Sequence, residues 1–211
     1  MYEAKQIDNL SIAYQKKGNG PVLLFLHGFT VDSRMWQPQI EKLSQQFTVI
    51  AWDAPGAGQS SDPPEGFTLS DWAKCLEKLL NSLEIRSAHM IGLSWGGILA
   101  QQYYSQFPKR IKSMILADTY AGWVGSLPRE ELNTRVSAVL HDAVLPVDKF
   151  VSKYLPSMFS ENPPKEVQEN FKKVMKDFHP VGFRLMASDL SGVDTRKIFA
   201  CYKSACITYM G

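Results

Sequence analysis

The segment Gly92-Leu93-Ser94-Trp95-Gly96 decides the fold, because it lies between a short apolar run and a run of helical composition that ends before Pro108. A serine with a glycine two residues to either side is typical of a sharp strand-to-helix turn, since the small residues let the backbone pass without a clash. Such a turn presents the serine hydroxyl at its tip, and the first N–H groups of the helix point to the same place. We therefore predict that Ser94 is a nucleophile. The alternative is a tight turn in which the serine has no catalytic role.

The residues around this turn alternate between short apolar runs and longer stretches of helical period. The first two apolar runs are separated by the turn signal Asp8-Asn9, and we expect them to pair as an antiparallel edge. The alternation predicts an α/β fold in which a mainly parallel sheet carries helices on both faces. Strands are expected at residues 2–7, 10–15, 21–26, 47–52, 88–93 and 113–118, and helices at residues 33–46, 68–83 and 96–107.

The alternation stops after residue 119, and helical patterns interrupted by prolines continue to about Leu190. We expect residues 1–119 to form the core and residues 120–190 to form a helical cap insertion over the sheet. Residues 191–211 would then return to the core. The prolines that interrupt the insertion are Pro128, Pro146, Pro156, Pro163, Pro164 and Pro180.

A second motif, His27-Gly28-Phe29-Thr30, directly follows the expected strand at residues 21–26. An oxyanion hole beside a serine turn takes one N–H from the residue after the nucleophile and another from the loop after this earlier strand. Those donors would be the backbone N–H groups of Trp95 and Phe29. His27 is more readily interpreted as a brace for this loop than as a catalytic base, which is the alternative.

A third motif, Asp53-Ala54-Pro55-Gly56-Ala57-Gly58-Gln59-Ser60, leaves the expected strand at residues 47–52. It lacks the spacing of a phosphate-binding loop, so we interpret it as a structural turn at the rim of the site. The three motifs, HG-F, D-x-PG-x-G-x-S and G-x-S-W-GG, follow one another in the order typical of the α/β-hydrolase superfamily. Residues 1 to about 196 therefore resemble that superfamily.

Within the superfamily, the DTYAGW segment and the proline-rich insertion look like small-molecule esterases and lactonases of the 3-oxoadipate enol-lactonase type. The resemblance implies that Ser94 attacks an acyl carbon, that Phe29 and Trp95 hold the oxyanion, and that water releases the acid. It implies a small-molecule substrate and no cofactor. Carbon–carbon bond hydrolases and cofactor-free haloperoxidases share the motifs and remain alternatives. Candidates for an apolar pocket, or simply for helix packing, are Trp123, Phe150, Met158, Phe178 and Met186.

The resemblance also implies a triad acid and a histidine after the insertion, and neither is present in this sequence. The four histidines are His27, His89, His141 and His179, and none follows a further core strand. Asp118 closes the expected strand at residues 113–118, where it would either cap a turn or orient a histidine. Without a base, a serine hydroxyl is a weak nucleophile. A non-catalytic remnant or binding protein is therefore the second hypothesis.

The composition favours a soluble small-molecule enzyme over other classes. A net charge of +2, with the charges interspersed, does not indicate a nucleic-acid partner. The apolar runs are too short for a membrane span, and the N-terminus has no pattern of a secretory signal, so we expect a cytoplasmic protein. The three cysteines have neither disulfide-framework nor metal-ligand spacing, and no sequence feature indicates an oligomeric state.

The tail KIFACYKSACITYMG departs from the expected pattern. The resemblance implies a stretch like LPAIKVPALLIWG after Asp194-Thr195-Arg196, and reading the tail one nucleotide later recovers most of it. Ile207-Thr208-Tyr209-Met210, for example, becomes Leu-Leu-Ile-Trp. We therefore expect a frameshift between about Asp194 and Ile198, with residues after about 196 out of frame and the last strands of the fold missing.

This hypothesis predicts that the shifted frame encodes the acid, the last strand and the histidine. Restoring that frame should give an active serine hydrolase whose activity disappears in Ser94→Ala, because the added histidine would activate the serine. Sequencing the gene from the codon of Asp194 onward and assaying the restored chain test this. A downstream frame with no coherent coding sequence would contradict the frameshift.

Overall fold

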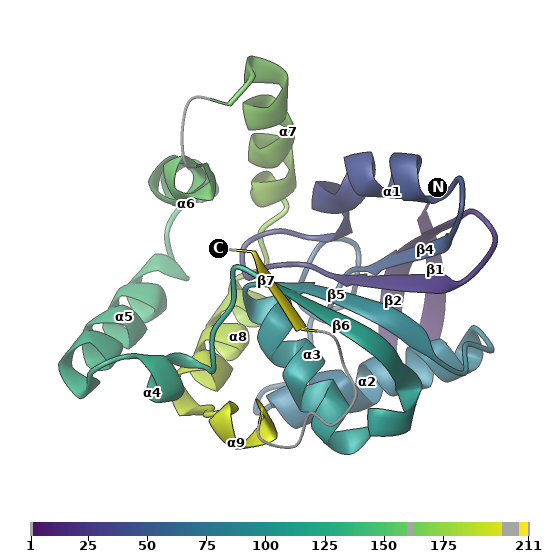
Figure 1. Ribbon diagram of the computed structural model, residues 1–211. Coiled ribbons are helices and arrows are strands. Elements are labelled where there is room, and N and C mark those ends of the chain that lie inside the picture. Colours follow the sequence, from purple (N-terminus) through teal and green to yellow (C-terminus); the bar gives the residue numbers. More distant parts are fainter. Residues whose placement is uncertain (1, 160–162, 200–206, 211) are drawn as a thin grey trace.

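A central seven-stranded sheet organises the computed structural model, which describes residues 2–159, 163–199 and 207–210 (Figure 1). Across the sheet the strand order is β1-β2-β4-β3-β5-β6-β7. Strands β3 to β7 run parallel, and β2 pairs antiparallel with both β1 and β4. The strands are β1 (Tyr2–Ile7), β2 (Leu10–Lys17), β3 (Val22–Leu26), β4 (Thr48–Trp52), β5 (Ala88–Leu93), β6 (Ile111–Ala117) and β7 (Ile207–Met210).

The sheet confirms the predicted fold class, an antiparallel edge followed by parallel strands with helices on both faces. The hairpin between β1 and β2 turns at Asp8, whose φ of 51° lies in the left-handed region. The core helices are η1 (Ser33–Trp36), α1 (Gln37–Leu43), α2 (Leu69–Ser82), α3 (Trp95–Gln106) and η2 (Pro108–Arg110).

Alternating side chains along the strands build one hydrophobic cluster on each face of the sheet. On one face, Phe25 of β3 and Val49 of β4 pack with Trp36 and Ile40 from η1 and α1. On the other, the strands pack against α2 and α3 in a larger cluster that extends into the cap. Two covered faces explain why β3, β4 and β5 are nearly continuous apolar runs.

Helix α2 shows how local sequence sets these elements. Thr68 and Asp71 form a capping box, in which each side chain accepts the backbone N–H of the other residue and so satisfies donors of the first turn. Apolar residues recur every three or four positions after it, and all of them are buried, as the sequence predicts. The buried stripe comprises Leu69, Trp72, Ala73, Cys75, Leu76, Leu79 and Leu80.

The cap lies beyond the ends of the parallel strands (Figure 1). A cluster of stacked and edge-on rings joins it to the core, with Phe29 of the loop after β3 stacked on Phe183 at 4.4 Å between ring centroids. Phe150 and Phe178 stack on each other and contact the same Phe183. The cap helices are α4 (Trp123–Ser126), α5 (Arg129–Asp142), α6 (Val147–Tyr154), η3 (Leu155–Met158), α7 (Lys165–Lys176) and α8 (Pro180–Gly192).

The tail forms the short helix α9 (Arg196–Phe199) and the strand β7. We expected the apolar strand at this point to be degraded, yet Ile207–Met210 pairs in parallel with β6, with Ile207 opposite Met114. The cysteines Cys201 and Cys206 lie outside the described residues. The frameshift and the domain boundaries at residues 119 and 190 stay predictions.

Asp189 of α8 is a carboxyl group in an unfavourable environment. It accepts the N–H of Leu69 at the start of α2, while its Oδ2 has no hydrogen-bond partner within the described part of the chain. Burial raises the pKa of Asp189 from 3.8 to about 7. The folded chain therefore holds this proton at pH values where the unfolded chain has lost it.

This shift predicts that folding stability falls as the pH rises from about 4 to about 7, because the unfolded state binds fewer protons there. Asp189→Asn keeps the neutral form at every pH. We expect it to raise the free energy of unfolding above pH 7 by on the order of 2 kcal/mol relative to the parent, and to lose this advantage toward pH 4. Urea unfolding of both chains across this range measures the difference. Parallel pH profiles would contradict the assignment.

Candidate active site

Ser94 lies at the tip of the turn between β5 and α3, with φ 51° and ψ −116°. A side chain at Gly92 would collide with the backbone of Gly96, and one at Gly96 would collide with the carbonyl oxygen of Leu26 on β3. Both glycines are therefore needed for α3 to start so close to the sheet. The strained serine and the two close approaches are the features that the sequence predicts for a nucleophile elbow.

Hydrogen bonds to the end of β6 hold the elbow in place. The Ser94 N–H donates to the Ala117 carbonyl at 3.0 Å, and the Thr119 hydroxyl donates to the Ser94 carbonyl at 2.7 Å. Thr119 also packs against Gly97, where any side chain would collide with it. The sequence gives Thr119 no role beyond its place in the DTYAGW segment, because its partner Ser94 lies 25 residues away along the chain.

Ser94 lines a cavity of about 510 Å³ between the core and the cap. Of the predicted pocket residues, Trp123 and Met158 line it, whereas Phe150, Phe178 and Met186 are not among its lining residues. Phe150 and Met186 are instead buried in the larger hydrophobic cluster. The lining comprises Gly28, Phe29, Thr30, Val31, Met35, Leu93, Ser94, Asp118, Tyr120, Trp123, Arg135, Ala138, Val139, Tyr154, Ser157, Met158, Phe171 and Leu190.

The two predicted oxyanion donors lie on segments that meet at this cavity. Phe29 belongs to its lining, and Trp95 is the first residue of α3, next to Ser94. The indole of Trp95 is fully buried and meets the Trp72 ring edge-on, at 5.4 Å between centroids. The side chain of Trp95 thus anchors the elbow, which leaves its backbone N–H as the group available to a reacting oxygen.

His27 braces the loop that carries Phe29. The ring is fully buried, its Nε2 accepts the Ala54 N–H at 3.0 Å, and its Nδ1 lies 2.7 Å from the Gly28 carbonyl. Because Nε2 accepts, Nδ1 carries the proton and donates to Gly28. Both ring nitrogens are engaged, so neither is free to take a proton from Ser94.

The other three histidines also lie away from Ser94. The Nδ1 of His89 lies 2.7 Å from the Ser113 hydroxyl, between β5 and β6, and His141 is exposed at the end of α5. His179 contacts the loop after β4. Among the described residues that line the cavity there is one carboxylate, Asp118, which directly follows β6 and has φ 40°.

A buried carboxylate, Asp53, ties the loops after β3 and β4 together. It accepts the Ser33 N–H at 2.9 Å and the Gln59 N–H at 2.8 Å. Burial, reinforced by the negative charge of Asp32, raises the pKa of Asp53. Asp32 in turn caps η1 and pairs with Arg34 at 2.6 Å. The third motif is therefore a structural turn, as predicted. It holds the loop that carries Phe29 in place.

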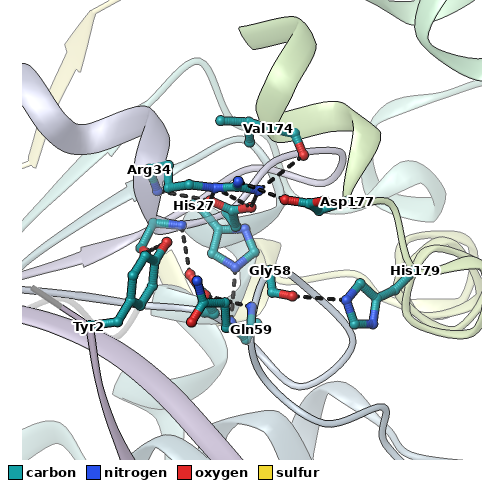
Figure 2. Close-up of polar contacts among 12 residues, drawn as sticks. Tyr2, His27, Arg34, Gly58, Gln59, Val174, Asp177 and His179 are labelled. Carbon is teal, nitrogen blue, oxygen red and sulfur yellow. Dashed lines mark hydrogen bonds and ion pairs between the residues drawn. The ribbon is translucent and has the colours of Figure 1, made fainter. Parts of the chain in front are cut away.

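The junction of α7 and α8 is clamped to these same loops (Figure 2). Arg34 reaches the carboxylate of Asp177 at 2.7 Å and the Val174 carbonyl at 3.3 Å. His179 places Nδ1 2.7 Å from Asp62 and Nε2 3.0 Å from the Gly58 carbonyl. The clamp fixes one wall of the cap against the core.

The described residues contain no group of three or more histidine, cysteine or acidic side chains that could hold a metal ion. In the same part of the chain, no helix is both long and apolar enough to cross a membrane. Cys75 is buried in α2, and its burial raises the pKa of the thiol to about 12. A thiol in that state is a core side chain rather than a nucleophile.

Comparison with known proteins agrees with this geometry. The family model described as alpha/beta hydrolase fold matches residues 21–167. The chain is 32% identical, over 68% of its length, to the dihydrolipoyllysine-residue acetyltransferase component of the acetoin cleaving system of Cupriavidus necator. It is 35% identical, over 59% of its length, to a poly(3-hydroxyalkanoate) depolymerase of Ectopseudomonas oleovorans. The matches cover 42% and 45% of those proteins, so the chain spans about half the length of the curated relatives it matches.

A solved structure of similar fold is an esterase from Exiguobacterium antarcticum. It superposes with a TM-score of 0.86 at 21% sequence identity, over 97% of this chain and 78% of the esterase. At that identity the likeness concerns the fold alone. The family model and the solved structure therefore agree on the fold.

Proposed function

The chain belongs to the α/β-hydrolase fold family, and from that premise we propose that it is the larger part of a serine hydrolase that cleaves a small ester or lactone through an acyl-enzyme at Ser94. The observation that carries the proposal is the strained turn, with φ 51° at Ser94, that opens into a cavity of about 510 Å³. A mostly apolar cavity of this size with a few polar groups suits a small organic substrate.

In the proposed reaction, the Ser94 oxygen attacks the acyl carbon and its proton passes to a base. The carbonyl oxygen becomes an oxyanion, which the backbone N–H groups of Phe29 and Trp95 stabilise. Collapse of this intermediate breaks the bond to the alkoxy group, which takes up a proton and leaves as an alcohol. Water then attacks the acyl-serine, releases the carboxylic acid and returns the proton to Ser94. These steps need no cofactor.

The reaction needs a general base, and the histidines of this sequence do not supply one. His27 and His179 are held by hydrogen bonds to loops, His89 faces Ser113, and His141 lies at the exposed end of α5. General base catalysis contributes about 10²- to 10⁴-fold. We therefore infer that the 211-residue chain forms the acyl-serine slowly and turns over poorly. A protein that binds such molecules without hydrolysing them is the second candidate, favoured by the cavity lining, in which no histidine takes part.

An activated ester with added imidazole tests the role of Ser94. With p-nitrophenyl acetate, mass spectrometry should find a single acetyl group on the peptide that contains Ser94. Imidazole should accelerate acetylation by roughly tenfold or more, because it supplies the missing base. The rate is corrected for the reaction of imidazole with the ester alone.

Ser94→Ala should lose this acetylation, and Ser82→Ala, at the far end of α2, serves as the matched serine control. No acetylation of the Ser94 peptide, with or without imidazole, would favour the binding protein. Acetylation that persists at the same rate in Ser94→Ala would contradict the nucleophile assignment.

A further inference from the structure

A second cavity, which we call the outer groove, lies between helix α7 and the segment formed by η1 and α1 (Figure 1). Its volume is about 510 Å³, as large as that of the Ser94 cavity. Met35 and Phe171 line both cavities, and no other described residue does so. Both side chains are half-buried. They therefore form the partition between the Ser94 cavity and the outer groove.

An apolar stripe on α7 forms one wall of the outer groove. Val167, Phe171 and Val174 follow one another at spacings of four and three residues, which places them on one face of the helix. Val174 is buried in the larger hydrophobic cluster, whereas Val167 is 38% exposed. Met35 and Pro38 line the groove from η1 and α1. Apolar surface therefore continues from the partition along the groove to the exposed Val167.

The charged side chains of the groove do not favour an ion of either sign. The described lining residues include two basic side chains, Arg34 and Lys173, and two acidic ones, Glu41 and Glu166. Arg34 is already held by two carboxylates, and Glu41 accepts a hydrogen bond from Gln37 at 2.9 Å. Balanced charges beside an apolar stripe suit an uncharged hydrocarbon chain better than an ionic ligand.

We propose that the outer groove receives an unbranched hydrocarbon chain of an ester bound at Ser94, and that Met35 and Phe171 form the gate through which the chain passes. The position of the ester rests on the proposed function, whereas binding of the chain in the groove does not. Methionine suits a gate because its unbranched side chain has three rotatable bonds and adapts its shape. A chain long enough to pass the gate buries extra methylene groups, so chain length determines specificity.

Photolabelling tests whether a chain crosses the gate. The probes are 2-dodecanone and 2-hexanone, each with a diazirine at the end of its chain, because a ketone offers a carbonyl group but no ester bond to cleave. Mass spectrometry should find the twelve-carbon probe on Val167 or Pro38, which line the groove and not the Ser94 cavity. Excess plain 2-dodecanone should suppress this label, and the six-carbon probe should label residues of the Ser94 cavity alone.

Two results of this labelling would overturn the proposal. One is the absence of the twelve-carbon label from the groove, or a label there that excess 2-dodecanone does not suppress. The other is equal labelling of the groove by the six-carbon probe, since a chain too short to span the gate would then reach the groove from outside.

A charge in the groove should interfere with the long chain alone. Val167→Glu should reduce labelling of Pro38 by the twelve-carbon probe roughly tenfold or more, because each methylene kept out of the groove lowers the affinity roughly fourfold. Val147→Glu is the matched control, since Val147 is 37% exposed, lies on α6 and does not line the groove. Labelling that is unchanged in Val167→Glu, or that falls equally in Val147→Glu, would contradict the assignment.

Closing the gate separates passage from the Ser94 cavity and entry from outside. Met35→Trp should remove the twelve-carbon label from Val167 and Pro38 while the label in the Ser94 cavity remains, because the larger ring fills the partition. Thermal unfolding of each variant checks that it is folded. A groove label that survives in folded Met35→Trp would overturn the gate.

Acylation of Ser94 shows which part of the ester carries the chain. If the acid does, p-nitrophenyl decanoate should acylate Ser94 faster than p-nitrophenyl acetate, and Val167→Glu should remove the advantage. If the alcohol side does, the same dependence on Val167 should appear instead for acetyl transfer from S-decyl thioacetate, compared with S-ethyl thioacetate.

The photolabelling does not depend on a reaction at Ser94. A label in the groove without any acylation of Ser94 would support the gate and contradict the hydrolase. Acylation of Ser94 without a label in the groove would support the hydrolase and overturn the gate.

Discussion

The close approach of α3 to the sheet is the constraint on which the rest of the structure depends. The helix starts against the carbonyl oxygen of Leu26, a contact that only glycine at position 96 permits. Ser94 has to adopt φ 51° to connect β5 to a helix placed there. Strain of this kind persists only when the surroundings fix it, and it puts the hydroxyl at the tip of the turn. Backbone packing therefore determines where the site lies, and side-chain chemistry acts within that position.

The surroundings fix the turn through the segments that follow β3, β4 and β6. Thr119 after β6 holds the carbonyl of Ser94, His27 after β3 spans to the loop after β4, and Asp53 joins those two loops from beneath. His27 and Asp53 are fully buried, Thr119 is half-buried, and all three are hydrogen-bonded, which makes the loops rigid. Rigid loops at the rim of the cavity keep the hydrogen-bond donors in position for a reacting carbonyl.

The sequence predicts those parts of the molecule that local patterns control. Strands, core helices, the turn at Ser94 and the bracing role of His27 follow from periodicity and from glycine spacing. Periodicity indicates that Phe150 and Met186 are buried, but not which surface they face, so the sequence left open whether they line the pocket or pack between helices, and the structure has them in the packing. The hydrogen bond of Thr119 to Ser94 and the clamp of Arg34 on Asp177 depend on segments brought together by the fold. The last pair is 143 residues apart, and no local signal could reveal it.

The central claim is that Ser94 is poised beside two backbone donors, and a crystal structure of the chain after reaction with a small alkyl fluorophosphonate tests it most directly. The account predicts a phosphorus atom bonded to the Ser94 oxygen, with a phosphonyl oxygen about 3 Å from the backbone nitrogens of both Phe29 and Trp95. An adduct on another side chain, or a phosphonyl oxygen turned away from both amides, would contradict it.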